Sequence, residues 1–584
     1  MIPQGEFEDL EGKAKERISD ATDNESRQAE GLADQARPKR SATTFVTPLT
    51  NFAIGNDTVA GSGPATGRCV RGVVEGNIPG MGLPGTAESY WMQSSGATEH
   101  DPLLAETNVD VAVVGGGIAG LCTAWELTKA GRAVAVLDAG RIAAGVTGNT
   151  TAKLTALHSL IYGDLTSSFG EQAAAQYASS QQDAVEHVAH TAAELNIDCD
   201  LERLPAFTYT TSADHVDRMA AEAEAAAKAG LPASFVNETG LPYPVAAAVR
   251  VDNQAQFHPR KYLLALAQAI IDHGGRIYEN TRIVDLDEGE PCRLRTATGA
   301  TVTAGEVVVA THYPIFDRAM LFARLVPHRD LVLAAPIPAD QDPLGMFITK
   351  EDNLRSVRTA PYLDGQRLLI VTGEKFTPGT DAVVEKFERL EAWMRQHFPI
   401  GEITHRWAAQ DNNSSDHLPF VGPLHAFAKH TWVATGFAGW GMSNGVMSGR
   451  LLAASITGQT LPWTELYDPR RLHPLTEAGP LLKAQAKVTS HFVGDRLKSP
   501  ALDSADELLP GTGAVLRLGG KRCAVYRDEA GALHTISATC THLGCIVAFN
   551  DAEKTWECPC HGSRFDVDGE VLQGPAIRPL SREA

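Results

Sequence analysis

The sequence predicts an α/β protein with a Rossmann-like core, followed by a small all-β domain. From about Asn108 an apolar strand (VDVAVV) leads into a glycine cluster, a helical stretch and a second apolar strand (AVAVLD). Ala-rich helical segments near 170–196 and 212–230 then alternate with strand-like segments such as 276–287, a pattern typical of an α/β fold. Beyond residue 506, short β-like runs are separated by Gly and Asp turns, which is typical of a small all-β module.

Composition and charge exclude several classes of protein. The chain has 584 residues, too many for one hydrophobic core, and a formal net charge of −20, which argues against a nucleic-acid partner. It contains no run of about 18 apolar residues that would predict a transmembrane helix. The first thirty residues are charged throughout and lack the apolar core of a secretory signal, so we expect a cytoplasmic protein.

The composition changes along the chain and divides it into five regions. A polar segment with weak helical periodicity is followed by a stretch rich in Gly, Pro, Ser and Thr that is typical of a linker. The α/β region and the all-β module follow, with a loose segment between them. The predicted boundaries are 1–40, 41–105, 106–472, 473–505 and 506–584.

The glycine cluster after the first strand has the spacing of a dinucleotide-binding turn. Gly115, Gly117 and Gly120 form G-x-G-x-x-G between a strand and a helix, and Asp138 ends the second strand 23 residues after Gly115. Such glycines allow a tight turn, close approach of a pyrophosphate and close packing of helix on strand. The helix N-terminus would then face the phosphates, and Asp138 would accept hydrogen bonds from ribose hydroxyls. The alternative is a structural βαβ turn that binds no nucleotide.

Three further stretches give residues 108–472 a resemblance to the D-amino-acid oxidase/glycine oxidase superfamily. They are RIAAGVTGNTTAK at 141–153, EVVVATHYP at 306–314, and DHLPFVGPL followed by TWVATGFAGWGMSNG within 416–445. The resemblance implies an FAD-binding domain of the glutathione-reductase type with an interleaved α+β substrate domain. It also implies flavin contacts, in the last stretch from a helix N-terminus that would stabilise negative charge on the flavin. The implied contacts in the first and last stretches are Thr147, Thr150, Gly439, Trp440, Gly441 and Met442.

Four of the nine cysteines lie in the last fifty residues, which is typical of a local cofactor site. Cys540 and His542 form C-x-H, and Cys558 and His561 form C-x-x-H. One thiolate and one imidazole from each of two loops are the ligands of a Rieske [2Fe–2S] cluster, with two Cys on one iron and two His on the other. Zinc is the competing metal, although structural zinc sites usually open with C-x₂₋₄-C.

The same segment resembles Rieske proteins of the cytochrome bc type. On that resemblance Cys545 and Cys560 form a disulfide between the cluster loops, and Gly574-Pro575 lies in the loop that covers the cluster. Ser563 matches a hydroxyl that donates to a bridging sulfur, whereas Phe565 replaces a common second donor, a tyrosine. Losing a hydrogen bond to the sulfurs disfavours the reduced cluster, so we expect a lower potential than in bc-type proteins. Proton loss from the two histidines should lower the potential further at high pH.

The amino-terminal residues 5–36 resemble CsbD-like bacterial stress-response segments. Their sequence (GEFEDLEGKAKERISDATDNESRQAEGLADQA) carries no candidate catalytic chemistry. A solvated helical hairpin or a partly disordered tail is the simpler interpretation.

Together these features predict a dehydrogenase that oxidises a small amine or amino acid by hydride transfer to FAD. The electrons would pass singly through the [2Fe–2S] cluster to an external one-electron acceptor. Substrate contacts are weakly indicated, because an Arg could clamp a carboxylate but each candidate is as easily structural. A reductase running in the opposite direction and a redox sensor in stress physiology stay open. The substrate candidates are Arg358 and Tyr209, with His258 and Arg355 as further possibilities.

Overall fold

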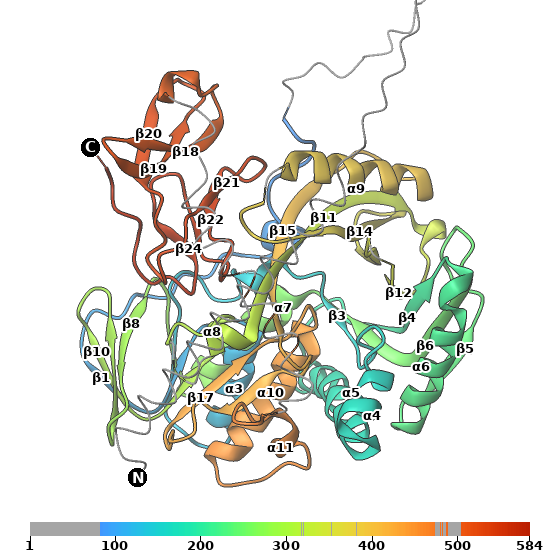
Figure 1. Cartoon of the computed structure of the whole chain (residues 1–584). Coiled ribbons are helices and arrows are strands. Elements are labelled where there is room, and N and C mark those ends of the chain that lie inside the picture. Colours follow the sequence, from blue (N-terminus) through green and yellow to red (C-terminus); the bar gives the residue numbers. More distant parts are fainter. Residues whose placement is uncertain are drawn as a thin grey trace, which may run out of the picture. The chain divides into compact units, whose positions relative to one another are not determined.

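The structure is a computed structural model that describes residues 82–472 and 504–583, apart from 317, 319, 320, 352 and 381, together with residues 479, 482, 486 and 488. The CsbD-like segment and the predicted linker up to residue 81 lie outside the described residues, as does most of the segment 473–503. Residues 79–584 form one compact unit. It contains two large sheets and two small ones (Figure 1).

The first large sheet carries the glycine turn. Its strand order is β16-β17-β10-β1-β2-β7, and β17, β10, β1, β2 and β7 run parallel to their neighbours. Central strands of a parallel sheet are buried on both faces, which explains the unbroken apolar runs in β1 and β2. The strands are β1 (Thr107–Val114), β2 (Val134–Leu137), β7 (Arg276–Tyr278), β8 (Ile283–Asp287), β9 (Cys292–Thr296), β10 (Thr301–Val309), β16 (Phe420–Pro423) and β17 (Thr431–Thr435).

The second large sheet is mostly antiparallel and lies between segments of the first in the sequence. Its order is β15-β11-β14-β13-β12-β4-β6-β3, with β5 paired to β6. The two sheets therefore interleave along the chain, as the sequence predicted. The strands are β3 (Lys153–Leu154), β4 (Glu202–Thr210), β5 (Ala233–Val236), β6 (Ala247–Gln256), β11 (Leu325–Pro338), β12 (Met346–Thr349), β13 (Ser356–Pro361), β14 (Gln366–Phe376) and β15 (His405–Ser414).

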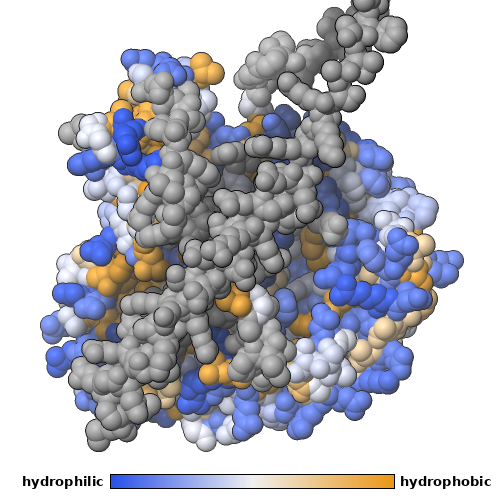
Figure 2. Space-filling model, in the orientation of Figure 1, coloured by the Kyte–Doolittle hydropathy of each residue, from blue (hydrophilic) through white to orange (hydrophobic). Residues whose placement is uncertain are grey.

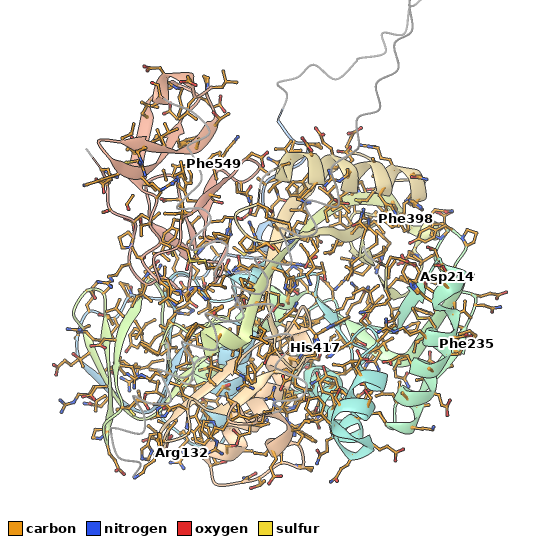
Figure 3. All side chains as sticks on the ribbon, in the orientation of Figure 1. Arg132, Asp214, Phe235, Phe398, His417 and Phe549 are labelled. Carbon is orange, nitrogen blue, oxygen red and sulfur yellow. A yellow bond between two sulfur atoms is a disulfide. The ribbon has the colours of Figure 1, made fainter. Side chains whose placement is uncertain are left out.

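Helices cover these sheets with their apolar faces. The apolar side of α9 packs against β11 and β14, and Phe398, the residue after the helix (labelled in Figure 3), belongs to the same apolar cluster. The predicted helical stretches correspond to α5 and α6. The α-helices are α2 (Tyr90–Gln93), α3 (Ile118–Lys129), α4 (Tyr162–Phe169), α5 (Glu171–Glu194), α6 (Val216–Lys228), α7 (Pro259–Asp272), α8 (Leu321–Arg324), α9 (Val383–His397), α10 (Gly441–Ile456) and α11 (Thr464–Tyr467). The 3₁₀ turns are η1 (Val146–Asn149), η2 (Ala213–His215), η3 (Ala339–Gln341) and η5 (Ala505–Glu507).

Residues 276–287 form two strands where the sequence predicted one. Asn280 lies between them in the left-handed region (φ 48°), a conformation that Asn tolerates better than most residues. The turn separates β7, which pairs with β2, from β8, which pairs with β9. The strand-like pattern runs through residues 276–287 without a break, so the sequence gave no sign of the turn at Asn280.

The C-terminal domain is entirely β, as predicted, and consists of two small antiparallel sheets. Phe549, labelled in Figure 3, stacks on Tyr526 and contacts Trp556 with ring centroids 5.5 Å and 5.0 Å away. These rings anchor the domain's small core. The strands are β18 (Thr512–Leu518), β19 (Lys521–Arg527), β20 (Leu533–Ser537), β21 (Ala548–Asn550), β22 (Thr555–Glu557), β23 (Arg564–Phe565) and β24 (Val571–Gln573).

None of the described helices is long and apolar enough to cross a membrane. The coloured part of the face in Figure 2 is largely hydrophilic, with apolar groups scattered over it.

Candidate functional site

The turn between β1 and α3 is very tight. Gly115 has a φ of 105°, and a Cβ there would lie 2.4 Å from the carbonyl oxygen of Ala310. A Cβ on Gly120 would lie 1.9 Å from the carbonyl oxygen of Gly115. Only glycine fits either position, so the helix starts directly at the sheet edge. Its first residues then line a cavity beside the turn.

Asp138 and Thr147 hold this turn from two sides. The Asp138 carboxylate accepts hydrogen bonds from the backbone N–H groups of Gly116 and Gly140, both at 2.8 Å. Thr147 accepts from the N–H of Ile118 at 3.1 Å, which satisfies one free donor of the helix N-terminus. Burial raises the pKa of Asp138 despite these two hydrogen bonds. Contact of Asp138 with a ribose stays a prediction.

The cavity has a volume of about 580 Å³ and opens at the N-termini of α3 and α10. Helix N-termini attract negative charge, and two of them at one cavity fit a dinucleotide such as FAD. Eight of the ten predicted FAD contacts line this cavity. Gly120 instead packs under the turn, and the Trp440 ring stacks on His158 at 4.6 Å. The eight are Gly115, Gly117, Asp138, Thr147, Thr150, Gly439, Gly441 and Met442.

The glycines of α10 have a packing role that the sequence motif did not reveal. A Cβ on Gly445 would lie 2.6 Å from Ile118, and one on Gly449 would lie 2.7 Å from Cys122. Both contacts are with α3, so α3 and α10 cross at close range. The crossing brings the two helix N-termini to the same cavity.

The C-terminal domain supplies part of the cavity wall. This wall was missed by sequence reasoning, because no local motif marks a surface that is completed by another domain. Arg282, whose side chain lines the cavity, donates to the Val571 carbonyl at 3.1 Å. The contributing residues are Arg564, Val571, Leu572, Gln573, Gly574, Ala576 and Ile577.

The predicted cluster ligands lie on two similar loops. In each loop a glycine N–H closes a turn by donating to the carbonyl of the preceding ligand cysteine at 3.0 Å, from Gly544 to Cys540 and from Gly562 to Cys558. The rings of His542 and His561 have centroids 5.0 Å apart. A disulfide between Cys545 and Cys560 ties the loops together, as the resemblance implied.

The chemistry of these side chains fits a [2Fe–2S] cluster. Both nitrogens of His561 and Nδ1 of His542 are buried without a hydrogen-bond partner. Burial lowers the pKa of His542 to about 4 and that of His561 to about 3, so both imidazoles are neutral at pH 7. A hydrogen bond from Cys558 lowers the pKa of the Cys540 thiol to about 7. Two neutral imidazoles, with two cysteines that ligate as thiolates, are the set that a Rieske cluster requires.

One group of three cysteines near the loops is not a metal site. The sulfur atoms of Cys545, Cys558 and Cys560 lie within 4.8 Å of one another. However, two of these three are joined in the disulfide and offer no thiolate. The metal-binding set is therefore Cys540, His542, Cys558 and His561, as the sequence predicts.

Ser563 and Phe565 lie beside the cluster loops. The Ser563 hydroxyl also contacts Cys540 and accepts from the N–H of Ala576 at 3.0 Å. Phe565 is fully buried in the apolar cluster that contains the loop cysteines. A tyrosine here, as in bc-type proteins, would add a hydroxyl to this buried ring.

Phe565→Tyr is expected to raise the midpoint potential of the cluster. An added hydrogen bond to a cluster sulfur stabilises the more negative, reduced state, and a net gain of about 1 kcal/mol corresponds to roughly 40 mV. A potentiometric titration followed by EPR measures the shift. Phe549→Tyr, at a partly buried ring that contacts Trp556, is the matched control and should leave the potential unchanged. An unchanged or lower potential in Phe565→Tyr would contradict the expectation.

The His561 loop contacts a strand that borders the cavity. Gln410 on β15, a strand that contributes to the cavity lining, donates to the Gly562 carbonyl at 2.9 Å. The rings of Tyr313 and Phe322 approach His561 with centroids 6.0 Å and 6.1 Å away. Through Gln410, a strand of the cavity wall is therefore bonded to the loop of a cluster ligand.

Buried ion pairs fix this contact between the domains. Arg329 on β11 is fully buried and binds both Glu553 and Glu557, the latter also fully buried. Arg564 contacts the same two carboxylates at 3.1 Å and 3.3 Å. Burial of Arg329 disfavours its charged form, but the carboxylates of Glu553 and Glu557 outweigh this and raise the pKa of Arg329 above its usual value. In addition, the Asp551 carboxylate accepts from the first N–H groups of α9.

The four weak substrate candidates lie outside the described lining of the cavity. Arg358 donates to the carbonyls of residues 151 and 152, and Arg355 pairs with Glu374 at 2.7 Å. The Tyr209 hydroxyl is bonded to that of another tyrosine, and His258 caps α7. Each of these groups has a structural partner, so a role in substrate binding stays a prediction for them.

Comparisons with known proteins match both halves of the chain. Residues 110–455 match the family described as FAD dependent oxidoreductase, and residues 499–582 match the Rieske [2Fe-2S] domain. The Rieske 2Fe-2S iron-sulfur protein YhfW of Bacillus subtilis is 34% identical over 497 residues, covering 85% of this chain and 97% of that protein. The cytochrome b6-f complex iron-sulfur subunit of Microcystis aeruginosa is 38% identical over 94 residues, 16% of this chain and 44% of that subunit.

Solved structures share the fold of the larger domain. L-proline dehydrogenase from P. horikoshii has a TM-score of 0.53 at 20% identity, covering 63% of this chain and 98% of that chain. L-amino acid deaminase from Proteus vulgaris has a TM-score of 0.54 at 14% identity, covering 65% and 100%. At these identities the likeness concerns the fold alone.

Proposed function

This chain belongs to the FAD-dependent oxidoreductase family and ends in a Rieske [2Fe–2S] domain, and on that basis we propose that it is an amine or amino-acid dehydrogenase. Its cofactors are FAD and a [2Fe–2S] cluster. The substrate would give up two electrons together, and an external acceptor would receive them one at a time.

The residues at the domain contact support this order of transfer. FAD accepts two electrons as a hydride, and the cluster carries one electron at a time. The Arg329 ion pairs hold the Rieske domain against the oxidoreductase domain, and Gln410 joins the cavity wall to the Gly562 carbonyl. A donor and acceptor fixed in this way need no diffusive encounter between the two domains.

The observation that carries the proposal is the shared wall of the cavity. Seven residues of the Rieske domain line the same cavity as the glycine turn of the oxidoreductase domain. An oxidase that delivers its electrons directly to O₂ has no use for an iron–sulfur centre at that wall. The arrangement therefore favours transfer within the chain and release of single electrons from the cluster.

The proposal is tested by anaerobic reduction of the whole protein. A panel of amines and amino acids is added, and the EPR spectrum of the cluster is recorded. A Rieske signal that appears with a substrate establishes both cofactors, their connection and the direction of flow. A signal that appears only with a chemical reductant overturns the dehydrogenase and favours the reductase or sensor. Absence of the signal in protein with its full iron content would contradict the cluster itself.

A further inference from the structure

One end of the cavity is acidic. Antiparallel β11 and β15 place Asp330 opposite Ala409 and His328 opposite Asp411. Residues directly opposite each other, and those two positions further along a strand, share a face of the sheet. Asp330 and Asp411 both line the cavity, together with Thr372 on β14. The N-termini of α3 and α10 line other parts of the same cavity.

Two polar atoms at this end have no partner within the described chain. Oγ1 of Thr372 is buried and makes no hydrogen bond, and Thr372 is 8% exposed. Oδ1 of Asp330 is likewise buried and unpaired. Leaving such a group unsatisfied costs about 1–3 kcal/mol, so a ligand that donates hydrogen bonds is expected here. We name Asp330, Thr372 and Asp411, which share one face of the sheet, the acceptor cluster.

The charges around the acceptor cluster favour a cation. Burial raises the pKa of Asp330 to about 6, although Lys375 opposes the shift. Burial would also raise the pKa of Asp411, but His312, 3.7 Å away, and the N–H of Asn412, which donates to Asp411, hold it below its usual value. Burial lowers the pKa of His328, which lies 3.5 Å from Asp330, to about 3, so this imidazole is neutral. Both carboxylates are therefore charged at pH 7.5.

A carboxylate ligand would meet repulsion at this end. The arginines among the described lining residues are Arg141, Arg282 and Arg564, and none belongs to β11, β14 or β15. Arg564 is already paired with Glu553, and Lys375 is exposed and absent from the described lining. An amino acid needs a cationic clamp for its carboxylate, whereas an amine needs only the acceptors that are present.

We propose that the acceptor cluster binds the ammonium group of an amine that carries no carboxylate. This inference rests on the proposed function and narrows its substrate class from amines and amino acids to amines. Asp330 and Asp411 supply the charge, and Thr372 supplies a further oxygen acceptor for an N–H group.

The test compares ligands that differ only in the carboxylate. Binding of n-butylamine and norvaline to the FAD-loaded protein is measured anaerobically by perturbation of the flavin spectrum and by calorimetry. tert-Butylamine has no α-hydrogen and reports binding without oxidation. We expect both amines to bind at least tenfold more tightly than norvaline. Equal or tighter binding of norvaline would overturn the inference.

Variants at the acceptor cluster test whether tert-butylamine binds there. Asp330→Asn is expected to weaken tert-butylamine binding at least tenfold with unchanged FAD content, while Asp340→Asn, at an exposed position, changes neither. Thr372→Val is an isosteric second variant, used if Asp330→Asn folds poorly. It is expected to weaken tert-butylamine binding two- to fivefold. Unchanged cation binding in both variants, or loss of FAD from a folded Asp330→Asn protein, would overturn the assignment.

The pH dependence of the wild-type protein gives an independent measurement. tert-Butylamine stays protonated between pH 5 and pH 7, whereas Asp330 is protonated as the pH falls through about 6. Affinity should therefore fall roughly tenfold from pH 7 to pH 5. Asp411, with its depressed pKa, and the neutral His328 keep their charge states over that range. Cation binding without cluster reduction by any oxidisable amine would uphold this inference and overturn the dehydrogenase proposal.

Discussion

Arg329→Met is expected to weaken the contact between the Rieske domain and the oxidoreductase domain and to slow electron transfer to the cluster by at least tenfold. Arg329 and Glu557 are both fully buried, and removing one partner of a buried pair costs about 3–5 kcal/mol. Arg564 can neutralise only one of the two carboxylates that remain. Stopped-flow measurement of cluster reduction, with parallel unfolding curves from flavin fluorescence and cluster circular dichroism, reports both effects.

Two comparisons separate the loss of this contact from a general loss of stability. Arg295→Met removes an ion pair with Asp285 whose side chains are 63% and 58% exposed, and should cost under about 1 kcal/mol. Arg329→Met/Glu557→Gln restores charge balance and should recover part of the rate. If the two domains of Arg329→Met unfold together and electrons reach the cluster at the wild-type rate, these ion pairs do not hold the domains together.

Gly120→Ala is expected to abolish FAD binding. The added Cβ would lie 1.9 Å from the Gly115 carbonyl oxygen, in a turn that is itself packed closely against Ala310. Alanine favours a helix over glycine by about 1 kcal/mol, but the clash displaces the turn and costs about 3 kcal/mol or more. The flavin content of the purified protein and its unfolding midpoint measure the outcome.

Gly96→Ala is the control for this substitution. A Cβ there has no heavy atom within 4 Å, so stability should change by less than about 1 kcal/mol and FAD content should not change. If Gly120→Ala keeps its full flavin content, α3 can shift without loss of FAD binding. The cluster, which lies in the other domain, should assemble in both variants as long as they fold.

Features that depend on short-range spacing were predictable from the sequence. The strand, glycine turn and helix at 108–130 are marked by glycines at fixed spacing, among them Gly120, which has no room for a Cβ beside the Gly115 carbonyl. The two cluster loops are likewise specified by spacing, since three or four consecutive residues bring a cysteine and a histidine to the same [2Fe–2S] cluster. The predicted fold class, cofactors and disulfide rest on such local patterns and are confirmed.

Long-range features were decided only by the tertiary structure. Arg329 meets Glu557 across 228 positions, and Gln410 meets Gly562 across 152. Likewise, the acceptor cluster exists only because β11 and β15 pair in one register, and a shift by one residue would turn Asp330 away from the cavity. The sequence alone determined which cofactors this protein binds, through motifs whose geometry is local. How the two domains share a cavity, and what charge the cavity offers a substrate, depend on which surfaces pack together, and no local pattern encodes that.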